Sequence, residues 1–187
     1  KHVLVGHENL IYSIAITSDD KFVVSASVDR LMIVWSMTTG HRIWDSDSRG
    51  HTKTICDIVI TRDDKNIISA SDDNTLIIWD FSSGKKMNVI HGIETTIFSV
   101  TILSDCRTII AGSNTKIGLW DLITCEEKNI FEGHTNIICS LAITRDDSRL
   151  ISGSEDGTLI IWEISTGKIL HRIFGHRASL SSVKLSI

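Results

Sequence analysis

The sequence predicts an all-β protein built from tandem copies of one four-stranded unit. Two observations predict this fold class: landmark residues recur at a nearly constant interval, and short apolar segments between them alternate with turn signals about every ten residues. Segments of this length that are rich in Ile and Val and bounded by Asp, Asn, Ser and Gly are typical of strands. No segment of the 187 residues has a convincing helical period. We therefore expect strands and turns throughout.

The interval between landmarks is that of a propeller blade. Tryptophan closes the third strand of each unit, and a Gly-His pair precedes three of the four tryptophans by 28 residues. The tryptophans are Trp35, Trp79, Trp120 and Trp162, with spacings of 44, 41 and 42 residues. The Gly-His histidines are His7, His51, His134 and, further on, His176. Four antiparallel strands repeated at this period indicate a β-propeller.

Every unit has the same internal layout. An alternating first strand is followed by an acidic turn, a second strand that ends in small residues, a tight turn, and an apolar third strand. The first strands are expected over 11–16, 55–60, 97–102 and 138–143. A fourth strand follows Gly40, Gly84 or Gly167. This layout predicts four complete blades over 6–48, 49–90, 91–131 and 132–174.

The two ends of the chain are predicted to belong to partial blades. Residues 1–5 are interpreted as the outer strand of a preceding blade, and residues 175–187 as the inner strand of a following one. Propellers close with four to eight blades. Three hypotheses therefore stay open: a segment of a larger ring in a longer chain, a ring completed by a second copy, or a compact small ring.

The Gly-His…Trp-Asp signature resembles that of WD40-repeat proteins, and the resemblance spans essentially the whole chain. Trp79-Asp80 and Trp120-Asp121 match the signature, whereas Trp35-Ser36 and Trp162-Glu163 are variants of it. The resemblance implies a WD40-type β-propeller. It also implies a non-catalytic scaffold that binds partner proteins or peptides on the propeller face.

The resemblance further implies a buried polar network in each blade, which links an indole, a hydroxyl, an imidazole and a carboxylate. In this chain the network residues are His7, Ser25, Asp29 and Trp35; His51, Ser69, Asp73 and Trp79; and His134, Ser152, Asp156 and Trp162. A Ser-His-Asp set is also typical of nucleophilic catalysis. Because the same trio recurs three times at blade spacing, we interpret it as structural and predict no catalytic residue.

The third blade lacks this network. Ile93 replaces the histidine, Ala111 replaces the serine, and the turn at 113–116 is one residue shorter and has no Asp. Losing all members together is expected, because a half-satisfied buried network costs more than none. It also indicates that the first serine of each pair is the network member. Cys125 stands where the other blades have glycine, which would cost about 1 kcal/mol if φ is positive there. The third blade should be the least stable of the four.

Trp44 stands outside the repeat pattern, in the fourth strand of the first blade. Two interpretations stay open: Trp44 packs on the outer flank of its blade, or it is exposed as a lateral anchor.

The resemblance places partner-binding positions three and five residues after the Gly-His histidine and just before the turn Asp. In this chain they are Leu10, Tyr12, Val28, Thr54, Cys56, Asp72, Thr96, Phe98, Asn114, Ile137, Cys139 and Glu155. Tyr12 and Phe98 are candidate aromatic anchors, with packing at the channel mouth as the alternative. Asp72 and Glu155 favour a basic peptide partner.

Several classes of function are disfavoured by composition. The net charge of −4 offers no basic surface for nucleic acid, and no apolar run approaches the roughly 18 to 20 residues of a membrane span. The four cysteines show no zinc-like spacing, and no phosphate-binding or dinucleotide motif is present, so no metal or cofactor is predicted. We interpret the cysteines as free thiols in the cytoplasm.

Two alternative functions stay open beside the interaction scaffold. One is a propeller-class hydrolase that uses carboxylates or histidines lining the channel. The other is a permanent structural element of a cytoskeletal or ciliary assembly, which an exposed Trp44 would favour.

Overall fold

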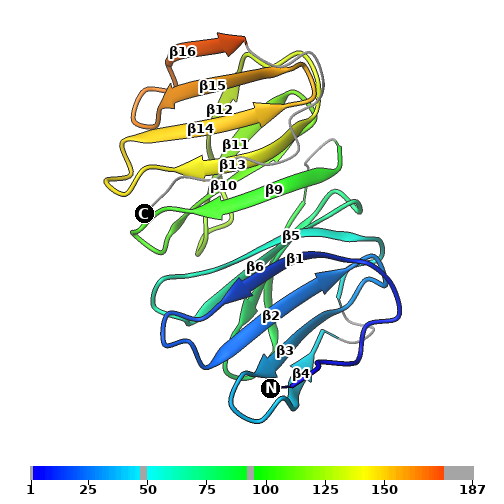
Figure 1. The fold of residues 1–187 in the computed structure, drawn as a ribbon. Coiled ribbons are helices and arrows are strands. Elements are labelled where there is room, and N and C mark those ends of the chain that lie inside the picture. Colours follow the sequence, from blue (N-terminus) through cyan, green and yellow to red (C-terminus); the bar gives the residue numbers. More distant parts are fainter. Residues whose placement is uncertain (1, 47–49, 92–94, 175–187) are drawn as a thin grey trace. The chain divides into compact units, whose positions relative to one another are not determined.

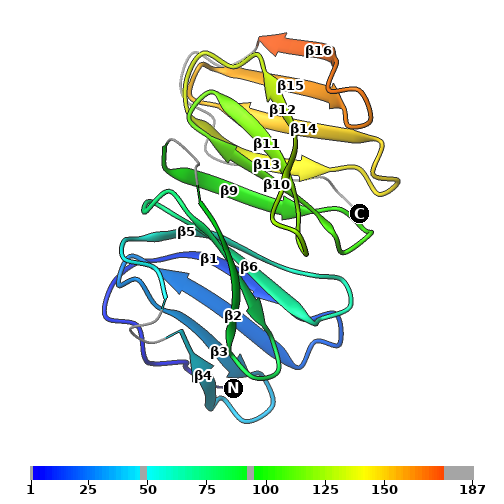
Figure 2. The ribbon, with the colours of Figure 1, turned by 180° about the vertical axis from the view of Figure 1, so that it is seen from behind.

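The fold is a series of four-stranded antiparallel sheets (Figure 1). The computed structural model describes residues 2–46, 50–91 and 95–174, which contain sixteen strands. In each sheet the strands follow one another in chain order, so every strand pairs with the next through a turn. Figure 2 shows the same strands from behind. Each sheet is one blade.

The strand bounds are as follows. The first blade contains β1 (Ile11–Ile16), β2 (Phe22–Ser27), β3 (Met32–Ser36) and β4 (Arg42–Asp45). The second contains β5 (Ile55–Ile60), β6 (Asn66–Ser71), β7 (Leu76–Asp80) and β8 (Lys86–Ile90). The third contains β9 (Ile97–Ile102), β10 (Thr108–Ser113), β11 (Lys116–Asp121) and β12 (Glu127–Glu132). The fourth contains β13 (Ile138–Ile143), β14 (Arg149–Ser154), β15 (Thr158–Glu163) and β16 (Ile169–Phe174).

These strands fall inside the expected blade limits with one exception. Strand β12 ends at Glu132, one residue beyond the predicted boundary at 131. The reason is the short turn after β10, which lets β11 begin at Lys116, and Lys116 pairs with Glu132 in the ladder. Residues 2–5, expected as an outer strand, form no strand in the structure. The segment 175–187 lies outside the described residues.

The inner strands carry a recurrent irregularity. In the first, second and fourth blades the register shifts by one residue at the second position of the inner strand, at Tyr12, Cys56 and Cys139. A bulge of this kind re-aims a side chain away from the ladder. The three residues at which the ladder register shifts are among those that the sequence assigns to the binding face.

The chain divides into two compact units, an N-terminal unit over Lys1–Ile97 and a C-terminal unit over Phe98–Ile187. Each has its own apolar core between two blades. In the N-terminal unit, β2 and β3 of the first blade pack on β5 of the second through Val24, Ala26, Met32, Val34, Ile55 and Ile58. In the C-terminal unit the equivalent core contains Ile110, Ile117, Leu119, Ile138 and Leu141.

Hydrogen bonds join the blades within each unit. In the N-terminal unit, the Ser13 hydroxyl donates to Asp57 at 2.7 Å, and the backbone and hydroxyl of Ser18 donate to Asp64. In the C-terminal unit, the backbone and hydroxyl of Ser104 donate to Asp147. The Ser13–Asp57 bond joins the inner strands β1 and β5, and the bonds to Asp64 and Asp147 pair the acidic turn of one blade with that of the next.

Trp44 is partly buried and packs on the neighbouring second blade. Its indole N–H donates to the Phe81 carbonyl at 3.0 Å, and its ring lies over Gly84, where an added Cβ would be 2.8 Å from Cδ2. The ring of Phe131 covers Gly167 in the same way, at 2.8 Å. Both glycines have positive φ, 65° and 71°. In both units, therefore, an aromatic ring from one blade covers the glycine in the turn between the third and fourth strands of the next blade.

Candidate functional site

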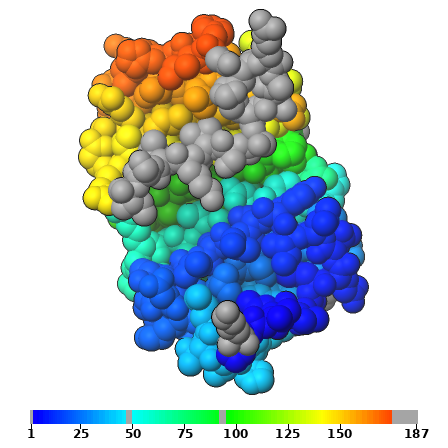
Figure 3. Space-filling view, viewed as in Figure 1, coloured from blue at the N-terminus to red at the C-terminus, as the bar shows by residue number. Residues whose placement is uncertain are grey.

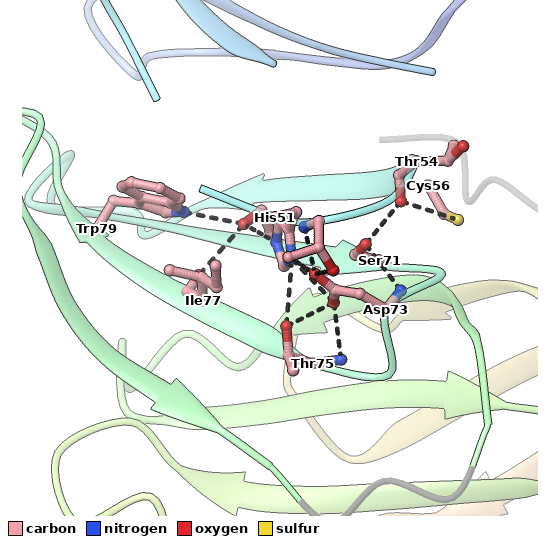
Figure 4. A network of polar contacts seen from close by, with 10 residues as sticks. His51, Thr54, Cys56, Ser71, Asp73, Thr75, Ile77 and Trp79 are labelled. Atoms are coloured by element: carbon pink, nitrogen blue, oxygen red, sulfur yellow. Dashed lines mark hydrogen bonds and ion pairs between the residues drawn. The ribbon is translucent and has the colours of Figure 1, made fainter. Parts of the chain in front are cut away.

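The buried network of the second blade joins strands β6 and β7 to the Gly-His loop and to the turn at Asp73 (Figure 4). Ser69 on β6 lies at its centre, accepting from the Trp79 indole at 2.9 Å and contacting His51 Nε2 at 2.7 Å. The other ring nitrogen of His51 is 3.0 Å from the Asp73 carboxylate. Ser69 and His51 are both buried. The network thus ties the Gly-His loop to the middle of the sheet.

The first and fourth blades bring their predicted residues together with the same geometry. His7 lies 2.7 Å from Ser25 and 2.8 Å from Asp29, and the Trp35 indole donates to Ser25 at 2.8 Å. The fourth blade repeats these bonds with His134, Ser152, Asp156 and Trp162, at 2.7 Å, 2.8 Å and 2.8 Å. In all three blades the first serine of the pair is the network member.

The donor and acceptor roles of the four groups indicate which atoms of the histidine and serine carry protons. A carboxylate can only accept, so the histidine Nδ1 carries the proton that faces the aspartate. The neutral ring then accepts at Nε2 from the serine hydroxyl, whose oxygen is free to accept the indole N–H. Burial lowers the pKa of His134, against the opposing effect of Asp156, and so favours this neutral form.

The turn carboxylates are held in the ionised form. Burial alone would raise the pKa of Asp73, but hydrogen bonds from His51 and Thr75 lower it well below its usual value. The pKa of Asp156 is lowered in the same way, chiefly by Thr158 and the Thr135 backbone N–H. These threonines, two residues after the aspartate, were not identified from the sequence. The Asp-x-Thr spacing they share was the available signal.

The geometry resembles a catalytic triad, but the serine has no reactive exposure. Ser69 and Ser152 are completely buried and Ser25 is 5% exposed. A nucleophile must reach a substrate carbonyl, whereas each of these oxygens is already occupied by an indole N–H. The arrangement holds the blade together and offers no chemistry to a substrate.

The same carboxylates hold the loop that precedes the inner strand of the blade. Asp29 accepts from the Glu8 backbone at 2.9 Å, and Asp73 accepts from the Thr52 backbone at 2.8 Å. The second serine of the pair completes the connection, because the Ser71 hydroxyl donates to the Thr54 carbonyl at 2.7 Å. The network therefore fixes the backbone of the loop that leads into the inner strand, where the sequence predicts partner-binding positions.

The third blade replaces the network with apolar packing. Ala111 is buried and pairs across the ladder with Gly118, where the other blades pair a serine with isoleucine. The Trp120 ring lies over Gly118, so that an added Cβ would be 2.6 Å from Cζ2. Among the described residues none accepts a hydrogen bond from the Trp120 indole. Sequence reasoning missed Gly118, although glycine at that strand position was the signal.

Cys125 has the left-handed backbone of the glycines it replaces. Its φ is 60°, compared with 72° at Gly40 and 65° at Gly84. The side chain is partly buried, and burial raises the pKa of its thiol. A non-glycine residue in this conformation costs about 1 kcal/mol.

The residues that the sequence predicts to bind a partner differ in exposure. In the N-terminal unit Leu10 and Tyr12 are 66% and 59% exposed, whereas Val28, Thr54, Asp72 and Thr96 are partly buried. In the C-terminal unit Asn114 and Glu155 are exposed, and Phe98 and Ile137 are partly buried. Asp72 is not free, because Thr96 donates to it at 2.5 Å. Tyr12 is therefore accessible to solvent, whereas the Asp72 carboxylate already accepts one hydrogen bond within the chain.

The described residues hold no cluster of His, Cys, Asp or Glu that could bind a metal ion. In the same ranges, no helix has the length and apolar character needed to cross a membrane.

Comparison with known proteins decides the family. The family model described as "WD domain, G-beta repeat" matches residues 1–36, 46–80 and 125–163, more than half of the chain. The chain belongs to the WD40 repeat family. The unmatched stretch, 81–124, contains most of the third blade, where the WD40 network residues are missing.

Solved structures show that this WD40 chain has the propeller fold. It is similar to "Structure of U3-55K", with 22% identity and a TM-score of 0.86 over 94% of this chain and 55% of that chain. It is also similar to "Crystal structure of RRP9 WD40 repeats", with 22% identity and a TM-score of 0.87 over 94% and 54%. The chain spans about half the length of these structures. No curated protein sequence matches it.

Proposed function

We propose that this WD40 chain is a non-catalytic interaction scaffold that binds partner proteins or peptides through the loops and turns at the Gly-His end of its blades. The observation that carries the proposal is the exposure of Leu10 and Tyr12, 66% and 59%, at the start of β1, directly after the loop whose Glu8 backbone N–H donates to the Asp29 carboxylate. An aromatic anchor on a rigid backbone binds with little loss of conformational entropy, as interface hot spots do.

The proposed partner is a peptide that carries basic residues beside an apolar one. Glu8 is exposed near Tyr12 in the N-terminal unit and is available to cationic side chains, and Glu155 is exposed in the C-terminal unit, which is considered by itself. Asp72 contributes less, because it accepts from Thr96. Tyr12 supplies the apolar contact in the N-terminal unit.

Selection from a displayed random-peptide library tests the proposal without a known partner. Peptides are selected on the immobilised chain, and their Kd is measured for wild type, Tyr12→Ala and Met87→Ala. Met87 is the matched control, since its side chain is 53% exposed on the outer strand β8. We expect Tyr12→Ala to weaken binding by tenfold or more, about 1.4 kcal/mol.

The control should leave the Kd unchanged. Selected peptides that bind Tyr12→Ala as tightly as wild type would contradict this site. Peptides without an excess of Lys and Arg would remove the basic preference and leave the scaffold function standing.

An intracellular location is part of the same proposal. Support comes from the four cysteines, all of which are unpaired, and from the burial that raises the pKa of Cys56 to about 11 and so disfavours its reactive thiolate. A role as a permanent structural element lacks the support expected from an exposed Trp44, because Trp44 packs on the second blade.

A further inference from the structure

The outer strand of the fourth blade, β16, has an open edge. It pairs with β15, and among the described residues no strand lies on its other side (Figure 1). Figure 3 shows the orange-red residues of this strand at the surface of the C-terminal unit. A strand at the edge of a sheet presents backbone N–H and C=O groups that have no partner within the sheet. The edge of β16 can therefore accept one more strand.

The side chains of β16 are mostly apolar and exposed. The exposed fractions are 41% at Ile169, 39% at Leu170, 46% at Ile173 and 76% at Phe174. Arg172 is partly buried, and its guanidinium donates to the Gly133 carbonyl at 2.6 Å. The strand contains no carboxylate. β16 therefore has little of the charge that commonly prevents strand addition at an edge.

The other outer strands have features that protect an edge. Each of them carries charged residues, which are Arg42 and Asp45 in β4, Lys86 in β8, and Glu127, Lys128 and Glu132 in β12. β4 and β8 are also shorter, with four and five residues. Charged side chains and short length both disfavour the addition of a strand. Among the described outer strands, β16 is therefore the one that is both long and apolar.

The basic residues at this edge indicate the charge of a partner. Lys168 directly precedes β16 and His171 lies within it, and both side chains are exposed. Within residues 95–174 neither of them takes part in an ion pair. Opposite charges on neighbouring strands stabilise a sheet. A strand with carboxylates beside apolar residues is therefore complementary to this edge.

A second copy of this chain is less complementary. If β16 paired with itself across a two-fold axis, Lys168, His171 and Arg172 of both copies would enter one sheet without a carboxylate from either strand. Like charges on neighbouring strands destabilise a sheet. Charge therefore disfavours self-pairing of this edge and favours an acidic partner.

We propose that β16 is a docking edge for an extended segment of a partner protein in which carboxylate residues alternate with apolar residues. The segment adds to the fourth blade as a fifth strand. Its backbone hydrogen bonds supply affinity, and its side chains supply the preference for this edge. The edge belongs to the C-terminal unit, whereas Tyr12 belongs to the N-terminal unit, so the proposal is independent of the binding role of Tyr12.

A synthetic peptide of about eight residues, in which Val and Glu alternate, tests the docking edge. Fluorescence anisotropy measures its Kd for the 187-residue chain, and amide exchange locates the contact. We expect saturable binding and slower exchange in β16, without a change in β12. A peptide of alternating Val and Lys should not bind. A Val–Glu peptide that is N-methylated at every peptide bond should not bind either, because it has lost its backbone donors.

Two lysine substitutions test the charge at the edge. Lys168→Glu should weaken binding of the Val–Glu peptide by roughly fivefold, because attraction is replaced by repulsion. Lys85→Glu is the matched control and should leave the Kd unchanged. Lys85 has the same position before β8, since its carbonyl accepts from the Asp80 N–H as the Lys168 carbonyl accepts from the Glu163 N–H. Tyr12→Ala should also leave this Kd unchanged, which separates the edge from the site proposed for Tyr12.

Several results would overturn the docking edge. They are the absence of Val–Glu binding, equal binding of the Val–Lys or N-methylated peptide, and equal effects of the two lysine substitutions. Slow exchange of every β16 amide in the free monomer would mean that the edge is already paired. The same exchange pattern in a dimer, detected by light scattering, would show that a second copy is the occupant and that the acidic partner is wrong.

Discussion

At the scale of the residue, one buried hydroxyl group satisfies two other buried groups. In the second blade the Ser69 oxygen accepts from the Trp79 indole and its proton goes to His51 Nε2. All three side chains are buried. Removing the hydroxyl leaves a donor and an acceptor unpaired, which costs more than the net value of one hydrogen bond.

Ser69→Ala should therefore lower the free energy of unfolding by roughly 2 to 6 kcal/mol, from two unsatisfied groups at about 1 to 3 kcal/mol each. Urea unfolding of Ser82→Ala provides the control. Ser82 is exposed and bonded only at the surface to Asp80, so its loss should change stability by less than about 0.5 kcal/mol. Similar values for the two variants would contradict the buried network.

Acidification should destabilise the chain in two ranges of pH. The pKa of His134 in the folded state is below its ordinary value of 6.5, because burial disfavours the imidazolium. Below about pH 6.5 the unfolded chain binds the proton and the folded chain resists it, so stability falls with pH. Asp73 and Asp156 have lowered pKa values in the fold, and their contribution is lost as pH falls below about 4.

Urea midpoints measured from about pH 7.5 down to about pH 3 check this dependence. We expect the urea midpoint to start to fall below about pH 6.5 and to fall more steeply below about pH 4. His41→Gln should leave the profile unchanged, because His41 is exposed on the turn before β4. A midpoint that stays constant between about pH 7 and pH 5 would contradict the neutral, buried state of His134.

Cys125→Gly should stabilise the chain by about 1 kcal/mol, because it relieves a residue held at a φ of 60°. The reverse change at an equivalent turn gives the comparison. Gly84→Ala should destabilise by more than about 1 kcal/mol, since its Cβ would also meet the Trp44 ring. Calorimetric unfolding measures both. A neutral Cys125→Gly would mean that strain at this turn is relieved elsewhere.

At the scale of the element, the third blade has two small residues on paired strands where the other blades have the polar network. Ala111 on β10 and Gly118 on β11 are ladder partners, and together they make room for the Trp120 ring. The blade has neither the imidazole nor the carboxylate that would tie its loop to the sheet. Among the described residues of this blade, the apolar packing of Trp120 occupies the position where the other blades have these hydrogen bonds.

Gly118→Ala should therefore destabilise the third blade by about 1 to 3 kcal/mol, because the new methyl group overlaps the Trp120 ring. Amide exchange measures the effect in β10 and β11, which should already exchange faster than β14 and β15 in the wild type. Ile123→Ala is the control, since Ile123 is 65% exposed on the β11–β12 turn. Equal exchange rates in the third and fourth blades would contradict the softer third blade.

The sequence predicted the elements better than their side-chain packing. The nearly constant spacing of the tryptophans indicated the third strand of all four blades, although Gly-His precedes only three of them, because strand length and turn chemistry are local properties. The ring of Trp120 could not be placed in this way. Its position depends on Ala111 and Gly118, which are seven residues apart in the chain and become neighbours only through strand register. Trp44 was undecided for the same reason, because its partner Phe81 belongs to another blade.

At the scale of the whole molecule, stability is expected to be local to each unit. Each unit has its own core and its own serine-to-aspartate hydrogen bond between acidic turns, Ser18 to Asp64 and Ser104 to Asp147. In propeller and repeat architectures stability is approximately a sum of repeat and nearest-neighbour terms. A core substitution should therefore act first on the unit that contains it.

Ile58→Ala should lower the stability of the N-terminal unit by about 2 to 5 kcal/mol, because Ile58 is 5% exposed in that core. Amide exchange should accelerate in β2, β3 and β5, with little change in β13 to β15. Leu141→Ala, in the core of the C-terminal unit, is the matched variant and should give the opposite distribution. Uniform acceleration in both variants would mean that the two units unfold together.

The indole bonds described above also give each blade its own spectroscopic signal. Three indole protons are committed to buried serines, at Trp35, Trp79 and Trp162, and a fourth is held by the Phe81 carbonyl. In a proton–nitrogen correlation spectrum these four resonances should persist after transfer to deuterated water, whereas the Trp120 resonance should fade first. Five well-separated peaks would then report the integrity of four blades at once, without any label added to the chain.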